Sequence, residues 1–221
     1  MALPHSKNIF QYPARFQWKQ YGAPCRGSSC CTDTCIQMMV EYYKDKTYSL
    51  ATIRRLAQAK TSYNEGPCTG INPIEALNAL DSLVGKGLYR VGTGVDAKFV
   101  QHKATIGPVL VGVHYGSYPT KKGKCGRRYN LRHAEISGKT DCSFTGAHAV
   151  VVIGSKIHRS STGKYLHTDM YARDPDHNSP TRPEKPAYDK FRRRDLLIAM
   201  RNLPRKTAFQ QTFVIYPTRR K

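Results

Sequence analysis

The chain has 221 residues, of which 39% are hydrophobic and 10% aromatic. This length suits one well-buried domain, and no apolar run approaches the roughly 18 to 20 residues that a membrane-spanning helix needs. Glycine and proline are scattered without a repeat, which excludes a collagen-like chain and argues against disorder throughout. We therefore expect a folded protein without a membrane span.

The charge is strongly basic, because 36 lysines and arginines face 15 acidic residues and give a net charge of +21. Such an excess attracts polyanions, so we expect an anionic partner: a cell-wall polymer, a nucleic acid or an acidic protein surface. The alternative is a crowded or salty setting that tolerates the charge. Sequence-specific nucleic-acid recognition is not predicted, since the basic clusters lack interleaved aromatic residues. A larger assembly is expected to hold the chain ends.

Seven cysteines are present, an odd number. Six can pair while one stays reactive, as in a disulfide-stapled protein with a functional thiol. The first seven residues are not followed by an apolar segment of signal-peptide length. We expect cytoplasmic synthesis and an extracellular or virion-associated location, reached by lysis, in a particle or through a dedicated secretion apparatus.

Three helices are predicted in the first half, after an N-terminal arm and loop over residues 1–28. Apolar residues recur at helical spacing from Cys31 onward, and Ser49 can cap a second helix from Leu50 to Ala59. Asn72 followed by a proline predicts the start of a third.

Strands are predicted in the second half. Three short β-branched or aromatic runs span residues 108–115, 147–153 and 211–216, and another strand ends near Arg173. Residues 117–145 are predicted as a basic loop or hairpin, and residues 188–200 are predicted as a helix. The order indicates an α+β fold. We expect one domain over residues 29–217, helical to about residue 105 and β-rich from 106, with a basic tail at 218–221.

Cys31, His148 and Asp174 occur along the chain in an order that suits nucleophilic catalysis. Cys31 opens a helix, where amide dipoles favour a thiolate. His148 opens an apolar strand after a glycine turn, and Asp174 ends another strand before a proline. A thiolate, an imidazole and an orienting carboxylate are the parts of a cysteine hydrolase. The alternative is that Cys31 is structural or half of a disulfide, since Cys30 is adjacent.

Four segments together resemble papain-like cysteine peptidases, most of all the type that processes bacteriocin leaders. They are the nucleophile helix Cys31 to Tyr43, the first barrel strand Gly107 to Val111, the histidine strand Gly146 to Gly154, and the Asp-Pro of Arg173 to Pro175. The resemblance covers about Gln17 to Tyr216. It implies a papain-like fold, in which a helical lobe packs on an antiparallel sheet or half-barrel, and implies Cys31, His148 and Asp174 as catalytic residues.

The chain departs from the family pattern at two positions. Thr32 stands where the family usually has glycine, and Cys25 stands where it usually has the oxyanion-hole glutamine. Gln20 is the nearest upstream candidate, with Gln17 behind it. For Gln20 to serve, the stretch Tyr21 to Cys30 must loop out, and a Cys25–Cys30 disulfide could hold it. A lapsed enzyme is therefore an open alternative.

Cys35 is the rival nucleophile, but its place in the apolar stripe favours burial or a disulfide to Cys68. Cys125 and Cys142 flank the basic loop and could pair across it. A zinc site among the clustered N-terminal cysteines is disfavoured, because adjacent cysteines suit tetrahedral ligation poorly. We expect no metal and no cofactor.

The sequence thus predicts a papain-like cysteine hydrolase that cleaves peptide or amide bonds. Its predicted substrates are polypeptides or the peptides of a bacterial cell wall, reached from a phage particle or by delivery into the target. The alternative from another class is a catalytically idle papain-like component of a larger assembly, which grips an anionic neighbour. A nuclease-like toxin on the same scaffold is the third alternative.

Overall fold

A computed structural model describes residues 31–59, 70–116, 145–173, 175, 189–201 and 213–220. The helices are α1 (Cys31–Lys44), α2 (Leu50–Ala57), α3 (Pro73–Val84), α4 (Ala97–Lys103) and α6 (Arg193–Arg201). The strands are β1 (Tyr89–Thr93), β2 (Val109–Gly116), β3 (Thr145–Arg159), β4 (Tyr165–Arg173), β5 (Asp189–Arg192) and β6 (Phe213–Pro217). None of the helices in these ranges has the length and apolar character that crossing a membrane requires.

The predicted helix starts are confirmed where the structure describes them. The Ser49 side chain accepts a hydrogen bond from the Thr52 amide at the start of α2. Asn72 caps α3 and forms a capping box with Glu75. Helix α2 ends at Ala57, two residues before the predicted end, because Gln58 adopts the left-handed conformation and closes the helix.

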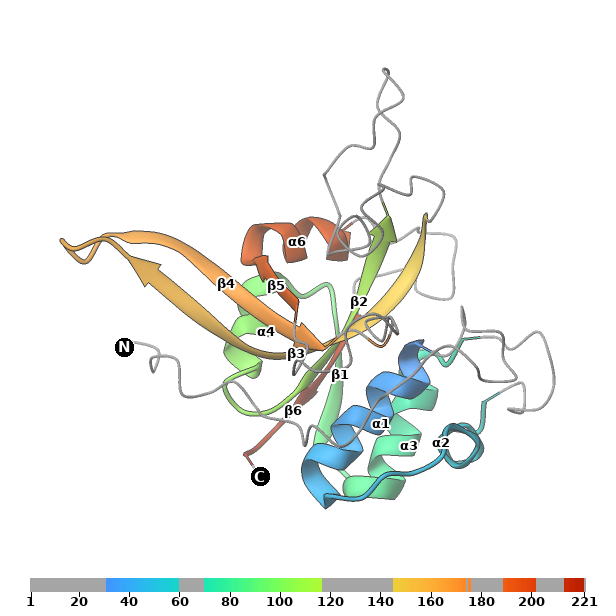
Figure 1. The fold of residues 1–221 in the computed structure, drawn as a ribbon. Coiled ribbons are helices and arrows are strands. Elements are labelled where there is room, and N and C mark those ends of the chain that lie inside the picture. The colour runs from blue at the N-terminus through green and yellow to red at the C-terminus, as the bar shows by residue number, and fades with distance from the viewer. Residues whose placement is uncertain are drawn as a thin grey trace, which may run out of the picture.

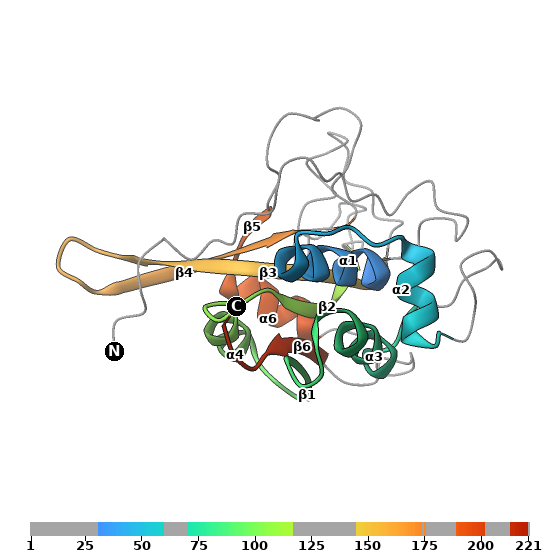
Figure 2. The same cartoon turned by 90° about the horizontal axis from the view of Figure 1, so that it is seen from below.

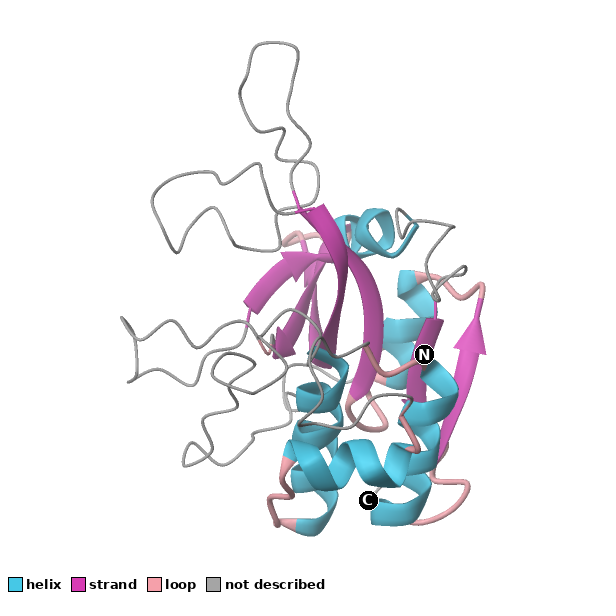
Figure 3. Cartoon of the chain, turned by 90° about the vertical axis from the view of Figure 1, so that its right-hand side faces the viewer, coloured by secondary structure: helices cyan, strands magenta, loops and turns pink. Residues whose placement is uncertain are grey.

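The strands form one sheet in the order β1-β6-β2-β3-β4-β5, and all its pairings are antiparallel. Strands β2 and β3 occupy the centre, with Val113 opposite His148 and Val109 opposite Val152. Figure 3 shows the strands running together as one curved sheet with helices packed against it.

Alternating side chains divide the apolar core into two layers. Ala149, Val151 and Ile153 of β3 pack in the layer that contains α1, α2 and α3. Val150 and Val152 pack on the opposite face, in the layer that contains α4 and α6. Figure 1 shows the two groups of helices on either side of the sheet. The predicted α+β arrangement, with N-terminal helices packed on an antiparallel sheet, is confirmed.

The prediction of a single helix over residues 188–200 is wrong in its first part. Asp189–Arg192 form β5, which pairs with residues 169–172 of β4, and α6 begins only at Arg193. The edge of β4 supplies backbone hydrogen bonds to this segment, and such pairing overrides the weak local helical pattern.

Strand β3 is longer than predicted and forms a projecting arm with β4. Its pairing with β2 ends at Val152, and its pairing with β4 continues to Arg159. We call residues 155–168 the hairpin arm, which extends from the body in Figures 1 and 2. At its tip, the Gly163 amide donates to the Ser160 carbonyl at 2.9 Å, and Gly163 has a φ of 80°.

Candidate active site

Cys31 is the first residue of α1. Its side chain is a free thiol, and the residue is 8% exposed, at the edge of the core layer that holds α1 to α3. Within the described ranges, its sulfur has no hydrogen-bond partner. A thiol in this position faces the unpaired amides of the first helical turn, as a nucleophile at a helix start does.

Cys35 fixes α1 against the centre of the sheet. Its Sγ donates a hydrogen bond to the Ala149 carbonyl oxygen at 3.4 Å, and the residue is fully buried. The Cys35 sulfur is not in a disulfide, so the alternative of a disulfide to Cys68 is wrong. The predicted burial of Cys35 is confirmed. This contact brings the first turns of α1 to the strand position next to His148.

His148 lies in β3 and is 6% exposed. The register pairs it with Val113, and Val113 and Val150 both belong to the core layer of α4 and α6. Strand alternation therefore assigns the His148 side chain to that face, whereas Cys31 belongs to the other. Strand β4 pairs with β3 only as far as the pair Arg173–Val151, so among the described residues no strand lies beside β3 on that edge before Val151.

Several predicted site residues lie outside the described residues. They are Asp174 and Gln20, together with Cys25, Cys30, Cys68, Cys125 and Cys142. The predicted N-terminal arm lies outside them as well. The orienting carboxylate and the oxyanion-hole side chain therefore stay predictions.

A buried ion pair anchors the first turn of α1, and sequence reasoning missed it. Nη1 of Arg54, in α2, lies 3.3 Å from both Asp33 carboxylate oxygens, and the two side chains are 1% and 0% exposed. Burial raises the pKa of Asp33 to about 7, against the opposing effect of the Arg54 charge. The partners are 21 residues apart, and no local pattern links them.

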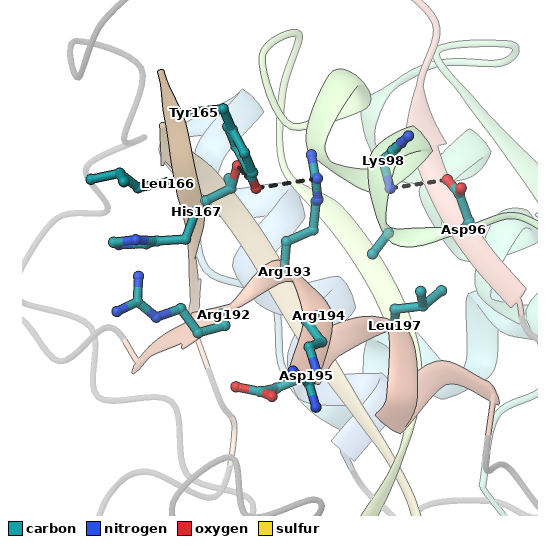
Figure 4. A pocket seen from close by; sticks show the side chains of 12 residues that line it. Asp96, Lys98, Tyr165, Leu166, His167, Arg192, Arg193, Arg194, Asp195 and Leu197 are labelled. Carbon is teal, nitrogen blue, oxygen red and sulfur yellow. Dashed lines mark hydrogen bonds between the residues drawn. The ribbon is translucent and has the colours of Figure 1, made fainter. Parts of the chain in front are cut away.

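A basic cavity of about 620 Å³ lies on the other side of the molecule, between α4, β4 and the start of α6. Four cationic side chains line it, Lys98 and Arg192 to Arg194, against the carboxylates of Asp96 and Asp195. Arg193 is held by Gln101 at 2.7 Å and by the Tyr165 hydroxyl at 3.3 Å. Figure 4 shows Arg193 beside Tyr165, and Arg192 beside His167.

No protein-family model matches the chain, and no curated protein matches it in sequence. A solved structure from Bacillus anthracis, described as a C39-like peptidase, aligns at 14% identity and a TM-score of 0.49 over 88% of this chain and 91% of its own. Two structures of SERA5E from Plasmodium falciparum align at 14% and 13% identity, with TM-scores of 0.41 and 0.42, over 96% of this chain and 91% of theirs.

Proposed function

We propose that the protein is a papain-like cysteine hydrolase of peptide or amide bonds, with Cys31 as its nucleophile. The observation that carries the proposal is the free thiol of Cys31 at the start of α1, one turn before a cysteine that is bonded to β3 beside His148. A helix start or a neighbouring base activates a nucleophilic thiol. Cys31 has the helix start, and His148 is the candidate base on the strand against which α1 packs.

The proposed reaction assigns one role to each residue. His148 takes the thiol proton, the Cys31 sulfur attacks the carbonyl carbon, and the protonated imidazole then gives its proton to the leaving amine. Water, deprotonated by His148, releases the acyl group from sulfur. Asp174 orients the imidazole, and the Cys31 amide with Gln20 stabilises the oxyanion. Loss of one such donor lowers the rate by about 10² to 10³.

Thiol alkylation tests the cysteine–histidine pair without a known substrate. Iodoacetamide at pH 6 should label Cys31 in the wild-type protein faster than any other cysteine, as peptide mapping by mass spectrometry reports. His148→Gln should slow this labelling at least tenfold, because the imidazole no longer accepts the thiol proton. His102→Gln, the same change at an exposed histidine of α4, is the matched control and should leave the rate unchanged. Equal rates in the wild type and His148→Gln would refute the pair.

For the substrate, we propose the peptide cross-links of a bacterial cell wall, reached from a phage particle or as a delivered effector. The net charge of +21 and the seven cysteines support this choice, since cell walls are anionic and lie outside the reducing cytoplasm. Purified protein should release peptide fragments from peptidoglycan, and Cys31→Ala should not. Equal release by both proteins, or release by neither, would exclude this substrate.

A second candidate function is that of an idle papain-like scaffold in a larger assembly. The register favours it, because strand alternation assigns His148 and Cys31 to opposite faces of the sheet. This candidate predicts slow Cys31 alkylation below pH 8 that does not respond to His148→Gln. The alkylation experiment therefore separates the two functions directly.

The anionic partner is proposed to bind at the basic cavity. Arg193 is fixed by two hydrogen bonds, and Arg192 and Arg194 leave their side chains partly or fully exposed beside it. Sedimentation with purified cell walls should weaken with rising salt and weaken further in Arg194→Gln. Arg55→Gln, an exposed change in α2, is the control and should bind like the wild type.

A further inference from the structure

Two histidines and an aspartate meet on one face of the hairpin arm. His158 of β3 lies directly opposite His167 of β4, and Asp169 is two residues further along β4. Side chains at these positions point to the same face of an antiparallel pair. The two imidazole rings stack with their centroids 4.2 Å apart and an angle of 17° between their planes.

The ligand atoms of this cluster converge. Nε2 of His158 lies 2.9 Å from Oδ2 of Asp169, and Nε2 of His167 lies 3.7 Å from Oδ1. All three ligand atoms lie within 4.8 Å of one another. Ligand atoms about 2.1 Å from a tetrahedral zinc ion are roughly 3.4 Å apart, a value that lies between the two nitrogen–oxygen separations.

Hydrogen bonds among the described residues do not satisfy Nε2 of His158. Nε2 of His158 is a buried atom without a hydrogen-bond partner in the described ranges, so its short approach to Asp169 lacks hydrogen-bond alignment. Nε2 of His167 is too distant from the carboxylate for a hydrogen bond. A cation between the three atoms would use both nitrogen lone pairs and an oxygen of the Asp169 carboxylate.

We propose that His158, His167 and Asp169 form a binding site for a divalent transition-metal ion, with Zn²⁺ as the metal that suits two imidazoles and one carboxylate. A fourth position stays open to water or to an anionic ligand. Arg192 donates to Oδ1 of Asp169 at 3.0 Å, which orients the carboxylate. Lys156, opposite Asp169, is exposed and can turn away from the ion.

The proposed site is independent of the proposed hydrolase. His148 and His158 lie on the same strand, and ten residues of strand span roughly 33 Å. An ion at the hairpin arm therefore cannot touch Cys31, and it would cross-link β3 and β4 close to the tip of the arm. Loss of the metal site would leave the reactivity of Cys31 unchanged. Loss of Cys31 reactivity would likewise leave metal binding unchanged.

The test uses the full-length protein after removal of metal with EDTA and dialysis. Zn²⁺ is titrated in competition with a chromophoric chelator, and Co²⁺ serves as a spectroscopic substitute. We expect the wild type to bind one zinc ion at this site. The variants His158→Gln and His167→Gln should each bind that ion at least about 100-fold more weakly than the wild type. His102→Gln, an exposed histidine of α4, is the matched control and should keep that ion.

Cobalt distinguishes this site from the cysteines. The difference spectrum between wild type and His167→Gln should contain d–d absorption without a sulfur-to-cobalt charge-transfer band. Far-UV circular dichroism checks that each variant folds, and a zinc-induced rise in melting temperature that both variants lose would support the site independently. Equal stoichiometry and affinity in the wild type and both variants, or a difference spectrum with thiolate character, would overturn the proposal.

Discussion

Replacing Arg54 by methionine should destabilise the protein in a way that depends on pH. Methionine keeps most of the apolar stem and the helical propensity of arginine but leaves the buried Asp33 carboxyl without its cation. At a separation of 3.3 Å, the pair interacts by about 5 kcal/mol for an effective dielectric constant of about 20. Its loss should raise the pKa of Asp33 further above its value of about 7, because the Arg54 charge no longer opposes the effect of burial.

The magnitude follows from the protons bound in each state. Above pH 7, Asp33 is ionised in both the folded and the unfolded wild type, so its contribution to stability is constant. In Arg54→Met the folded carboxyl stays protonated, while the unfolded one is ionised, so stability falls by about 1.4 kcal/mol per pH unit. At pH 9 this loss is about 3 kcal/mol. At pH 5 only the hydrogen bonds of the guanidinium are lost, about 1 kcal/mol.

Urea denaturation at pH 5, 7 and 9 measures the effect, with Arg55→Met as the matched control. Arg55 is the next residue of α2 and is exposed, so its replacement should change the free energy of unfolding by less than about 0.5 kcal/mol at every pH. A loss in Arg54→Met that is the same at pH 5 and pH 9 would refute the assignment of Asp33 as its buried partner.

Three further changes in the stability of the folded protein are expected. The Asp33 contribution should lower wild-type stability by about 4 kcal/mol from pH 4 to pH 7, because the folded pKa of about 7 exceeds the unfolded one, and Asp33→Asn should remove this slope in pH-dependent urea denaturation. Asn72→Ala, which removes the capping box with Glu75, should cost about 1 kcal/mol by the same method, and an unchanged stability would contradict the cap. Gly112→Ala should cost about 1 to 3 kcal/mol in thermal unfolding, since a Cβ there overlaps the Phe213 ring, and Phe213→Leu in the same chain should recover part of the loss.

Helices and strands with a clear cap or a clear residue pattern in their own sequence were predicted correctly. The Asn72 cap with its following proline gave the start of α3, and the β-branched run after residue 108 gave β2. The short strand β1 and the helix α4 were missed, because five and seven residues carry too little periodicity to stand out. The strand β5 depends on an edge supplied by β4, which no local pattern reports.

In the candidate sites too, the features set by local sequence were predicted, and those set by packing between distant segments were not. Cys31 at a helix start and His148 in a strand were predicted from their local sequence, whereas the face to which His148 points depends on its register with Val113. The Asp33–Arg54 pair depends on the packing of two helices. The hairpin arm did carry a usable signal, because alternating residues flank a turn that contains Gly163.

The hairpin arm also offers an attachment point. Its turn is closed by hydrogen bonds among its own residues, such as Ser160 to Lys164 at 2.8 Å, so the rest of the fold does not depend on it. Twelve residues of strand, roughly 40 Å, separate the turn from His148. A fluorophore or affinity peptide introduced between Ser160 and Lys164 would therefore stand clear of the thiol, and would let the protein be immobilised or tracked with its chemistry intact.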